Sequence, residues 1–79
     1  MSTKLQEKRL AAGLSQPQLA AKADVNFRVL QCYEQGKKNF DHARLDTIYK
    51  LAIALDCSLS DLIETEDFIE LINKYEGRI

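Results

Sequence analysis

Two closely spaced helix-start signals constrain the fold of this chain more than any other feature. The stretch Ser-Gln-Pro-Gln from Ser15 combines a capping serine, a proline in the first turn, and Gln18 at the position that completes a capping box. Asn26 is a second preferred cap, and Asp24 just before it tolerates the left-handed backbone of a tight turn. The sequence therefore predicts a short helix, a tight turn and another helix that ends before Gly36.

A first helix is predicted ahead of this pair, from about Thr3 to Ala12. Gly13 suits the left-handed position that follows a helix end. We expect the apolar side of this helix to consist of Leu5, the stem of Lys8 and Leu10.

Three more helices are predicted further along the chain. Asp41 is the expected cap of a helix from His42 to about Leu55, Ser58 with Asp61 signals a short fifth helix, and Thr65 is the expected cap of a sixth. The core-facing positions of the fourth helix are predicted to be Leu45, Ile48, Tyr49, Leu51, Ala52 and Leu55. A broad apolar face in the sixth helix comprises Phe68, Ile69, Leu71, Ile72 and Tyr75.

Strand signals are almost absent, so an all-α fold is predicted: a compact five-helix domain over residues 1–64 and a C-terminal amphipathic helix over residues 65–79. With 79 residues, 46% of them hydrophobic, the chain is near the lower size for a self-sufficient core, which argues against a large enclosed active site. No apolar run approaches a membrane span and no signal peptide is recognisable, so we expect a cytoplasmic protein.

Few side chains in the sequence are arranged for metal binding, redox activity or catalysis. Cys32 and Cys57 are too far apart for a redox pair or zinc cluster, and His42 alone cannot complete a metal site, so no metal or cofactor is expected. The sequence shows no nucleophile with a base and an orienting group, no glycine-rich phosphate loop and no carboxylate pair in a cleft. We therefore expect that the protein is not an enzyme.

Charge is distributed unevenly along the chain. The sequence pI of 5.7 argues at first against a nucleic-acid partner. Residues 1–50, however, carry nine Lys or Arg against five Asp or Glu, a balance of +4, whereas residues 51–79 carry two against seven, a balance of −5. A basic front joined to an acidic back indicates a polyanion-binding surface or an acidic interaction tail.

The order of these signals resembles the helix-turn-helix of the phage repressor and Cro type, often called Xre-like. The resemblance covers roughly residues 4–63 and is carried by "RLAAGLSQPQLAAKADV", "NFRVLQCYEQGKKN" and "LDTIYKLAIALDCSLSDLI". The apolar positions of the motif correspond to Leu19, Ala23, Val25, Leu30 and Tyr33, and Ala20 stands where two helices cross closely. The chain departs from the family pattern at Asp24, where glycine is usual, and in a longer connection after Gly36.

The resemblance implies that the chain binds double-stranded DNA and that residues 26–35 form the recognition helix. Such a helix lies in the major groove and presents one arc of side chains to the base edges. The predicted base contacts on this arc are Phe27, Arg28, Gln31, Cys32 and Gln35. The predicted contacts to the DNA backbone are Gln16, Asn26, Lys37, Lys38, Asn39 and Arg44. Arg9 and Glu34 match a pair that joins the first and third helices in relatives, and a partly buried ion pair is expected between them.

Each of these residues also has a simpler interpretation. Arg28 and the pair Lys37 and Lys38, taken alone, are typical of solvated surface. Phe27 can instead be half-buried against the first helix, and Cys32 is better explained as a small hydrophobic residue than as a redox sensor.

The function predicted from the sequence is a sequence-specific DNA-binding transcriptional regulator, a repressor that acts by occupying an operator. The apolar face of the last helix either folds back on its own core or pairs with a second copy, and a homodimer on a palindromic operator is the prediction. The alternative is a protein-interaction module, or an antitoxin whose acidic C-terminal helix docks a protein partner.

Overall fold

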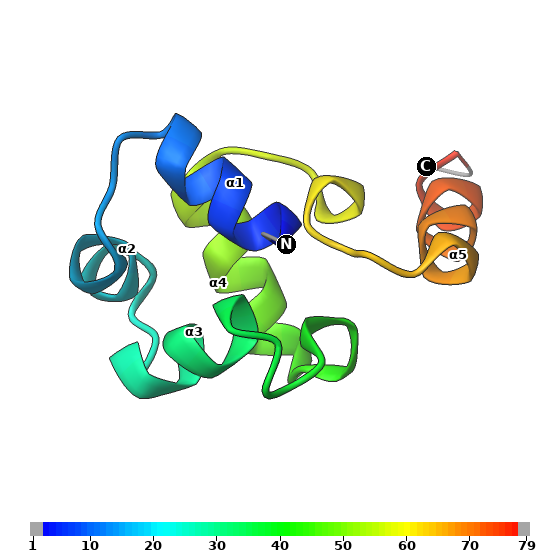
Figure 1. The fold of residues 1–79 in the computed structure, drawn as a ribbon. Coiled ribbons are helices and arrows are strands. Elements are labelled where there is room, and N and C mark those ends of the chain that lie inside the picture. Colours follow the sequence, from blue (N-terminus) through cyan, green and yellow to red (C-terminus); the bar gives the residue numbers. More distant parts are fainter. Residues whose placement is uncertain (1–2, 78–79) are drawn as a thin grey trace.

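The computed structural model describes residues 3–77 and contains no β-strand there, so the all-α prediction is confirmed (Figure 1). The ends of the two predicted domains, residues 1–2 and 78–79, lie outside the described residues. The α-helices are α1 (Lys4–Ala11), α2 (Gln16–Ala23), α3 (Phe27–Glu34), α4 (Leu45–Leu55) and α5 (Glu66–Glu76). Two short 3₁₀ turns connect them, η1 (Phe40–His42) and η2 (Leu59–Asp61).

Local capping determines where α2 and α3 begin. The Ser15 hydroxyl accepts a hydrogen bond from the Gln18 amide, and the Gln18 side chain accepts one from the Ser15 amide, which completes the predicted capping box. Asn26 accepts from the amide of Arg28 at 2.8 Å and so caps α3. Between the two helices Asp24 has a φ of 56°, the left-handed conformation expected for the tight turn.

Five leucines form the centre of the core that holds the first four α-helices together. Each has a relative exposure below 2%; they are Leu5, Leu19, Leu30, Leu51 and Leu62. Ala20 and Ala23 are also buried on α2, which packs on both α3 and α4. Small side chains at this position allow α2 to approach both neighbours closely, so α3 is fixed against the core by its neighbours as well as by its own residues.

The predicted apolar side of α1 is only partly correct. Leu5 is fully buried, but Leu10 is 59% exposed and Lys8 is exposed as well. Arg9 is buried in their place because it forms an ion pair with Glu34. A charged residue therefore occupies part of the face that α1 turns toward the core.

The prediction that Asp41 caps the fourth helix is wrong. The chain forms η1 at that point, and α4 begins only at Leu45, where no side chain caps it. Asp41 is buried and accepts hydrogen bonds from the amides of Glu64 at 3.0 Å and Thr65 at 2.8 Å, and from the Thr65 hydroxyl. It therefore fixes the segment that leads into α5 rather than the start of α4.

The short fifth helix predicted at Ser58 is a single 3₁₀ turn. Ser58 and Asp61 still form the expected capping box, but the turn ends at Asp61. The helix predicted after Thr65 is present as α5, so residues 3–77 contain five α-helices and a sixth α-helix is not found there.

The rest of the chain covers only part of the apolar face of α4. Ile48, Leu51 and Ala52 are buried as predicted, but Leu45 and Tyr49 are 66% and 47% exposed, so their assignment to the core is wrong. The α5 helix packs only partly against the core, through Phe68, Ile69 and Ile72. Its other two apolar residues, Leu71 and Tyr75, are exposed.

Candidate nucleic-acid interface

One side of α3 is anchored in the core. Leu30 is fully buried, and Tyr33 contacts Phe40 of η1 edge to face, with ring centroids 5.4 Å apart. Such aromatic pairs are stabilising beyond the area that they bury. The contact connects the last turn of α3 to the segment that follows it, so that the loop of Lys37, Lys38 and Asn39 is closed at both ends.

The predicted ion pair between Arg9 and Glu34 is present and joins α1 to α3. Arg9 donates from Nε to Glu34 Oε2 at 2.8 Å and from Nη2 to Oε1 at 3.0 Å, a bidentate arrangement. Arg9 Nη1 also donates to the Leu14 carbonyl at 2.8 Å. The carboxylate and the guanidinium are thus both satisfied, and the pair is more deeply buried than the sequence suggested, with side chains only 9% and 1% exposed.

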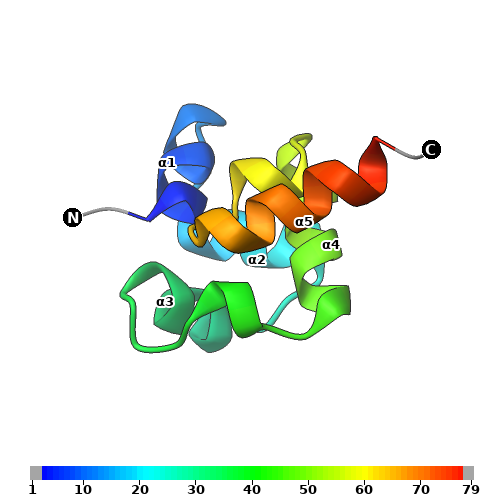
Figure 2. The ribbon, with the colours of Figure 1, turned by 90° about the vertical axis from the view of Figure 1, so that its right-hand side faces the viewer.

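The opposite side of α3 is open to solvent in part. Phe27, Arg28 and Gln35 are exposed to solvent. Gln31 and Cys32 are less accessible, and each is partly buried. At helical spacing, four of the five predicted base-contact residues share one arc of α3, and the fifth, Gln35, is the residue at its C-terminal cap. None of the five belongs to the core. Both views place α3 and the segment through residue 44 along the lower edge of the molecule (Figures 1 and 2).

A comparison of the sequence with known families agrees with this arrangement. The sequence model of a helix-turn-helix family matches residues 5–62, which is more than half of the chain and contains α2, the turn and α3. The chain belongs to the Xre-like helix-turn-helix family. This is a family of DNA-binding regulators and not of enzymes. No curated protein and no solved structure matches the chain.

The match covers only part of the structure. It begins in α1 and ends just after η2, so α5 lies outside the matched residues.

Among residues 3–77, no helix has the length and apolar character needed to cross a membrane.

The predicted backbone-contact residues of this Xre-like domain are spread over three segments. Gln16 begins α2, Asn26 caps α3, and Lys37 and Lys38 are exposed in the loop after α3. Asn39 and Arg44, like Gln16 and Asn26, have side-chain partners within the chain. Asn39 accepts from the Asp41 amide at 3.0 Å, and exposed Arg44 forms an ion pair with Asp46 at 3.3 Å. Contact of these six residues with DNA stays a prediction.

A hydrogen-bonded connection between the ion pair and the exposed arc was not predicted from the sequence. Gln16 Nε2 donates to Glu34 Oε1 at 3.1 Å, and Gln31 Nε2 donates to Gln16 Oε1 at 3.4 Å. The side chains of Gln16 and Gln31 are therefore oriented by the same carboxylate that holds Arg9. Their spacing in the sequence carries no signal of this contact, because it depends on how α2 packs on α3.

The two cysteines are free thiols in different surroundings. Cys32 lies on α3 and is partly buried. Burial raises the pKa of the Cys57 thiol, the nearby Asp61 carboxylate raises it further, and Lys8 opposes the shift. A raised pKa leaves less thiolate at neutral pH, so Cys57 is poorly suited to act as a nucleophile.

Proposed function

We propose that this protein is a sequence-specific transcriptional repressor of the cytoplasm that occupies an operator through α3. Two copies bind a palindromic site, each with its α3 helix in the major groove of one half-site. A single short helix contacts few base pairs, and a symmetric pair doubles the sequence that is recognised.

The observation that carries this proposal is the division of α3 into a fixed side and an open side. Leu30, Tyr33 and Glu34 hold the helix against the core, and Arg28 projects into solvent from the other side. Arg28 has the donors to bind guanine O6 and N7 together, and the Gln31 amide suits adenine. A helix fixed in this way can enter a groove without reorganising the domain.

The segment after α3 supplies positive charge at the same edge. Lys37 and Lys38 are both exposed, and residues 1–50 have a balance of +4. Lysine contacts to phosphates fix the register of the helix and release counterions, which makes affinity depend on salt. The acidic residues that bring the whole chain to a net charge of −1 are concentrated after residue 50 instead.

Selection of bound duplexes from a random DNA pool at low salt is the direct test. We expect one enriched palindromic motif, and binding to it should weaken steeply as salt is raised. Arg28→Ala should reduce affinity by about tenfold or more, the loss of one bidentate base contact. Lys22→Ala removes an equal charge from an exposed position on α2 and serves as the matched control.

Each outcome bears on the proposal. A motif that Arg28→Ala loses and Lys22→Ala retains supports it. No enriched motif at low salt, or equal losses in the two variants, contradicts it. A protein partner whose affinity is insensitive to salt would instead favour the interaction-module or antitoxin function.

A further inference from the structure

A chain of hydrogen bonds runs from the buried ion pair to the predicted base contacts of α3. Arg9, whose side chain is only 9% exposed, donates two hydrogen bonds to Glu34. Gln16 Nε2 donates to Glu34 Oε1 at 3.1 Å, and Gln31 Nε2 donates to Gln16 Oε1 at 3.4 Å. We call these four residues the glutamine relay. It connects the core to a side chain on the exposed arc.

The chemistry of the partners fixes the direction of every bond in the glutamine relay. A guanidinium only donates, and an ionised carboxylate only accepts. Gln16 must therefore turn its nitrogen toward Glu34, and its oxygen is left to face Gln31. Gln31 must in turn present its nitrogen to that oxygen. A glutamine without such partners exchanges its oxygen and nitrogen by a half-turn of the amide, whereas the amide of Gln31 has one orientation.

The orientation of this amide decides which base Gln31 is able to read. Within residues 3–77, no other hydrogen bond uses its Oε1 or its second N–H. In the major groove adenine presents the N6 donor next to the N7 acceptor, while guanine presents two acceptors. An amide that offers an oxygen and an N–H side by side fits adenine. It cannot turn its N–H toward guanine O6 without breaking its bond to Gln16.

We propose that Gln16 is a positioning residue that fixes the amide of Gln31, so that α3 requires adenine at the base pair that Gln31 contacts. This inference rests on the proposed function and adds a specificity determinant to it. It also replaces the predicted phosphate contact of the Gln16 side chain, because the oxygen and one N–H of that side chain are bonded within the chain. Gln16 then affects DNA binding through Gln31.

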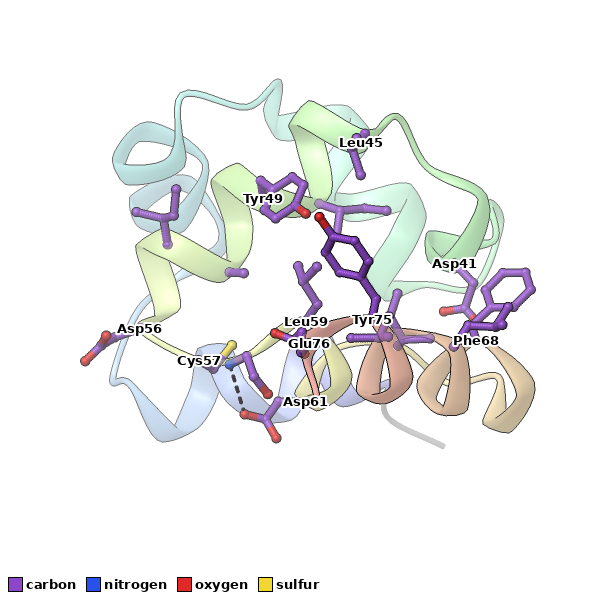
Figure 3. A pocket seen from close by; sticks show the side chains of 17 residues that line it. Asp41, Leu45, Tyr49, Asp56, Cys57, Leu59, Asp61, Phe68, Tyr75 and Glu76 are labelled. Carbon is purple, nitrogen blue, oxygen red and sulfur yellow. Dashed lines mark hydrogen bonds between the residues drawn. The ribbon is translucent and has the colours of Figure 1, made fainter. Parts of the chain in front are cut away.

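The glutamine relay is separate from the apolar face of α5 that is predicted to form the dimer. Figure 3 shows the groove of about 1040 Å³ that α4 and α5 line, in which Tyr75 of α5 extends toward Tyr49 of α4. None of the four relay residues lines this groove. A substitution in the relay therefore leaves this face unchanged, and a lost dimer does not explain a change in base preference.

The affinities of the full chain for variants of the selected DNA motif test the inference. Each duplex carries one of the four base pairs at one position of one half-site. Gln31→Met identifies the base pair that Gln31 contacts, as the position at which the preference is lost. We expect the wild type to prefer adenine there by about tenfold or more, and Gln16→Met to reduce this preference to about threefold or less. The preferences at all other positions should stay unchanged.

Three controls separate this effect from other roles of Gln16. Loss of a phosphate contact would weaken binding to every duplex alike. Gln6→Met makes the same substitution at a partly buried position of α1 and should leave all the affinities unchanged. The double variant of Gln16→Met and Gln31→Met should have the base preference of Gln31→Met alone, because Gln16 acts only through Gln31. Far-UV circular dichroism checks that each variant folds.

The side-chain amide of Gln31 also provides a measurement that needs no DNA. Nitrogen-15 relaxation gives its order parameter, which reports motion on the picosecond to nanosecond timescale. Gln16→Met should lower the order parameter, because the amide of Gln31 then has no acceptor at that position. Gln6→Met should leave it unchanged.

The outcomes distinguish this inference from the proposed function. The absence of an enriched motif contradicts the proposed function and this inference with it. An enriched motif with equal losses on every duplex in Gln16→Met, or with a base other than adenine preferred at the Gln31 position, overturns the inference alone. An unchanged order parameter of Gln31 in Gln16→Met overturns it whether or not a motif is found. Selective loss of the adenine preference together with a lower order parameter supports it.

Discussion

Replacing Glu34 by alanine removes the acceptor of the ion pair that joins α1 to α3. In the wild-type chain this carboxylate accepts two hydrogen bonds from Arg9 and one from Gln16, and its side chain is almost fully buried. The variant leaves a guanidinium that is nine-tenths buried with only the Leu14 carbonyl as an acceptor. A buried charge without a counter-ion is the costly state of such a pair.

The expected loss in the free energy of unfolding is about 3 kcal/mol. Breaking a buried ion pair by removing one partner costs about 3–5 kcal/mol, and the lower end applies because Arg9 keeps one hydrogen bond. A chain of this size has a total stability of about 4–12 kcal/mol at ~0.05–0.15 kcal/mol per residue, so the variant would lose a large part of it. Urea unfolding followed by circular dichroism measures the change, with the m-value as a check on two-state behaviour.

Two further variants make the result decisive. Lys50→Ala breaks an exposed ion pair with Asp24, 3.8 Å between Lys50 Nζ and Asp24 Oδ2, and should cost less than about 1 kcal/mol. Arg9→Met combined with Glu34→Leu removes both charges and should recover most of the loss, because neither is then left unpaired. A cost below about 1 kcal/mol for Glu34→Ala, or a double variant as unstable as the single one, would refute the reasoning.

Two predictions concern the segment around α5. Asp41→Ala should cost about 2–3 kcal/mol, because it removes the acceptor for the Glu64 and Thr65 amides and the Thr65 hydroxyl, and amide exchange should accelerate in α5 before the other helices. Equal acceleration in all helices would contradict this. Hydrogen bonds from the Ser58 amide and hydroxyl lower the pKa of Asp61 below its ordinary value of 3.8. The ionised carboxylate therefore stabilises the fold above the unfolded pKa and loses this contribution as the pH falls through the folded one. Asp61→Asn should lower the urea midpoint at pH 7, and the difference from wild type should shrink in acid; a constant difference would contradict the assignment.

The elements that sequence reasoning located well are those whose boundaries depend on neighbouring residues. The capping box at Ser15 and the cap at Asn26 lie within a few residues of the groups that they satisfy, so their signals are complete in the local sequence. Gly13 adopts a φ of 73° for the same local reason, since it follows the end of α1. The start of the proposed recognition helix is therefore predictable from the amino-acid sequence alone.

Asp41 shows where local signals fail. An aspartate ahead of an apolar helical pattern is typical of a helix cap. The carboxylate oxygens of Asp41 instead accept hydrogen bonds from the amides of Glu64 and Thr65, more than twenty residues further along the chain. Gln16 and Gln31 are similar, because they meet only when α2 packs on α3. In both cases the partner is determined by the tertiary fold, and the spacing of residues in the sequence does not report it.

The exposed side of α4 follows from a related limit of periodicity. A helical pattern identifies which residues form an apolar stripe, but it does not say how much of the stripe the same chain covers. In this chain α5 packs through Phe68, Ile69 and Ile72 and leaves the flank of α4 at Leu45 and Tyr49 uncovered. These two residues were predicted as core because their spacing is that of core residues. The prediction was wrong because helical spacing reports the face on which a side chain lies and not whether another element covers that face.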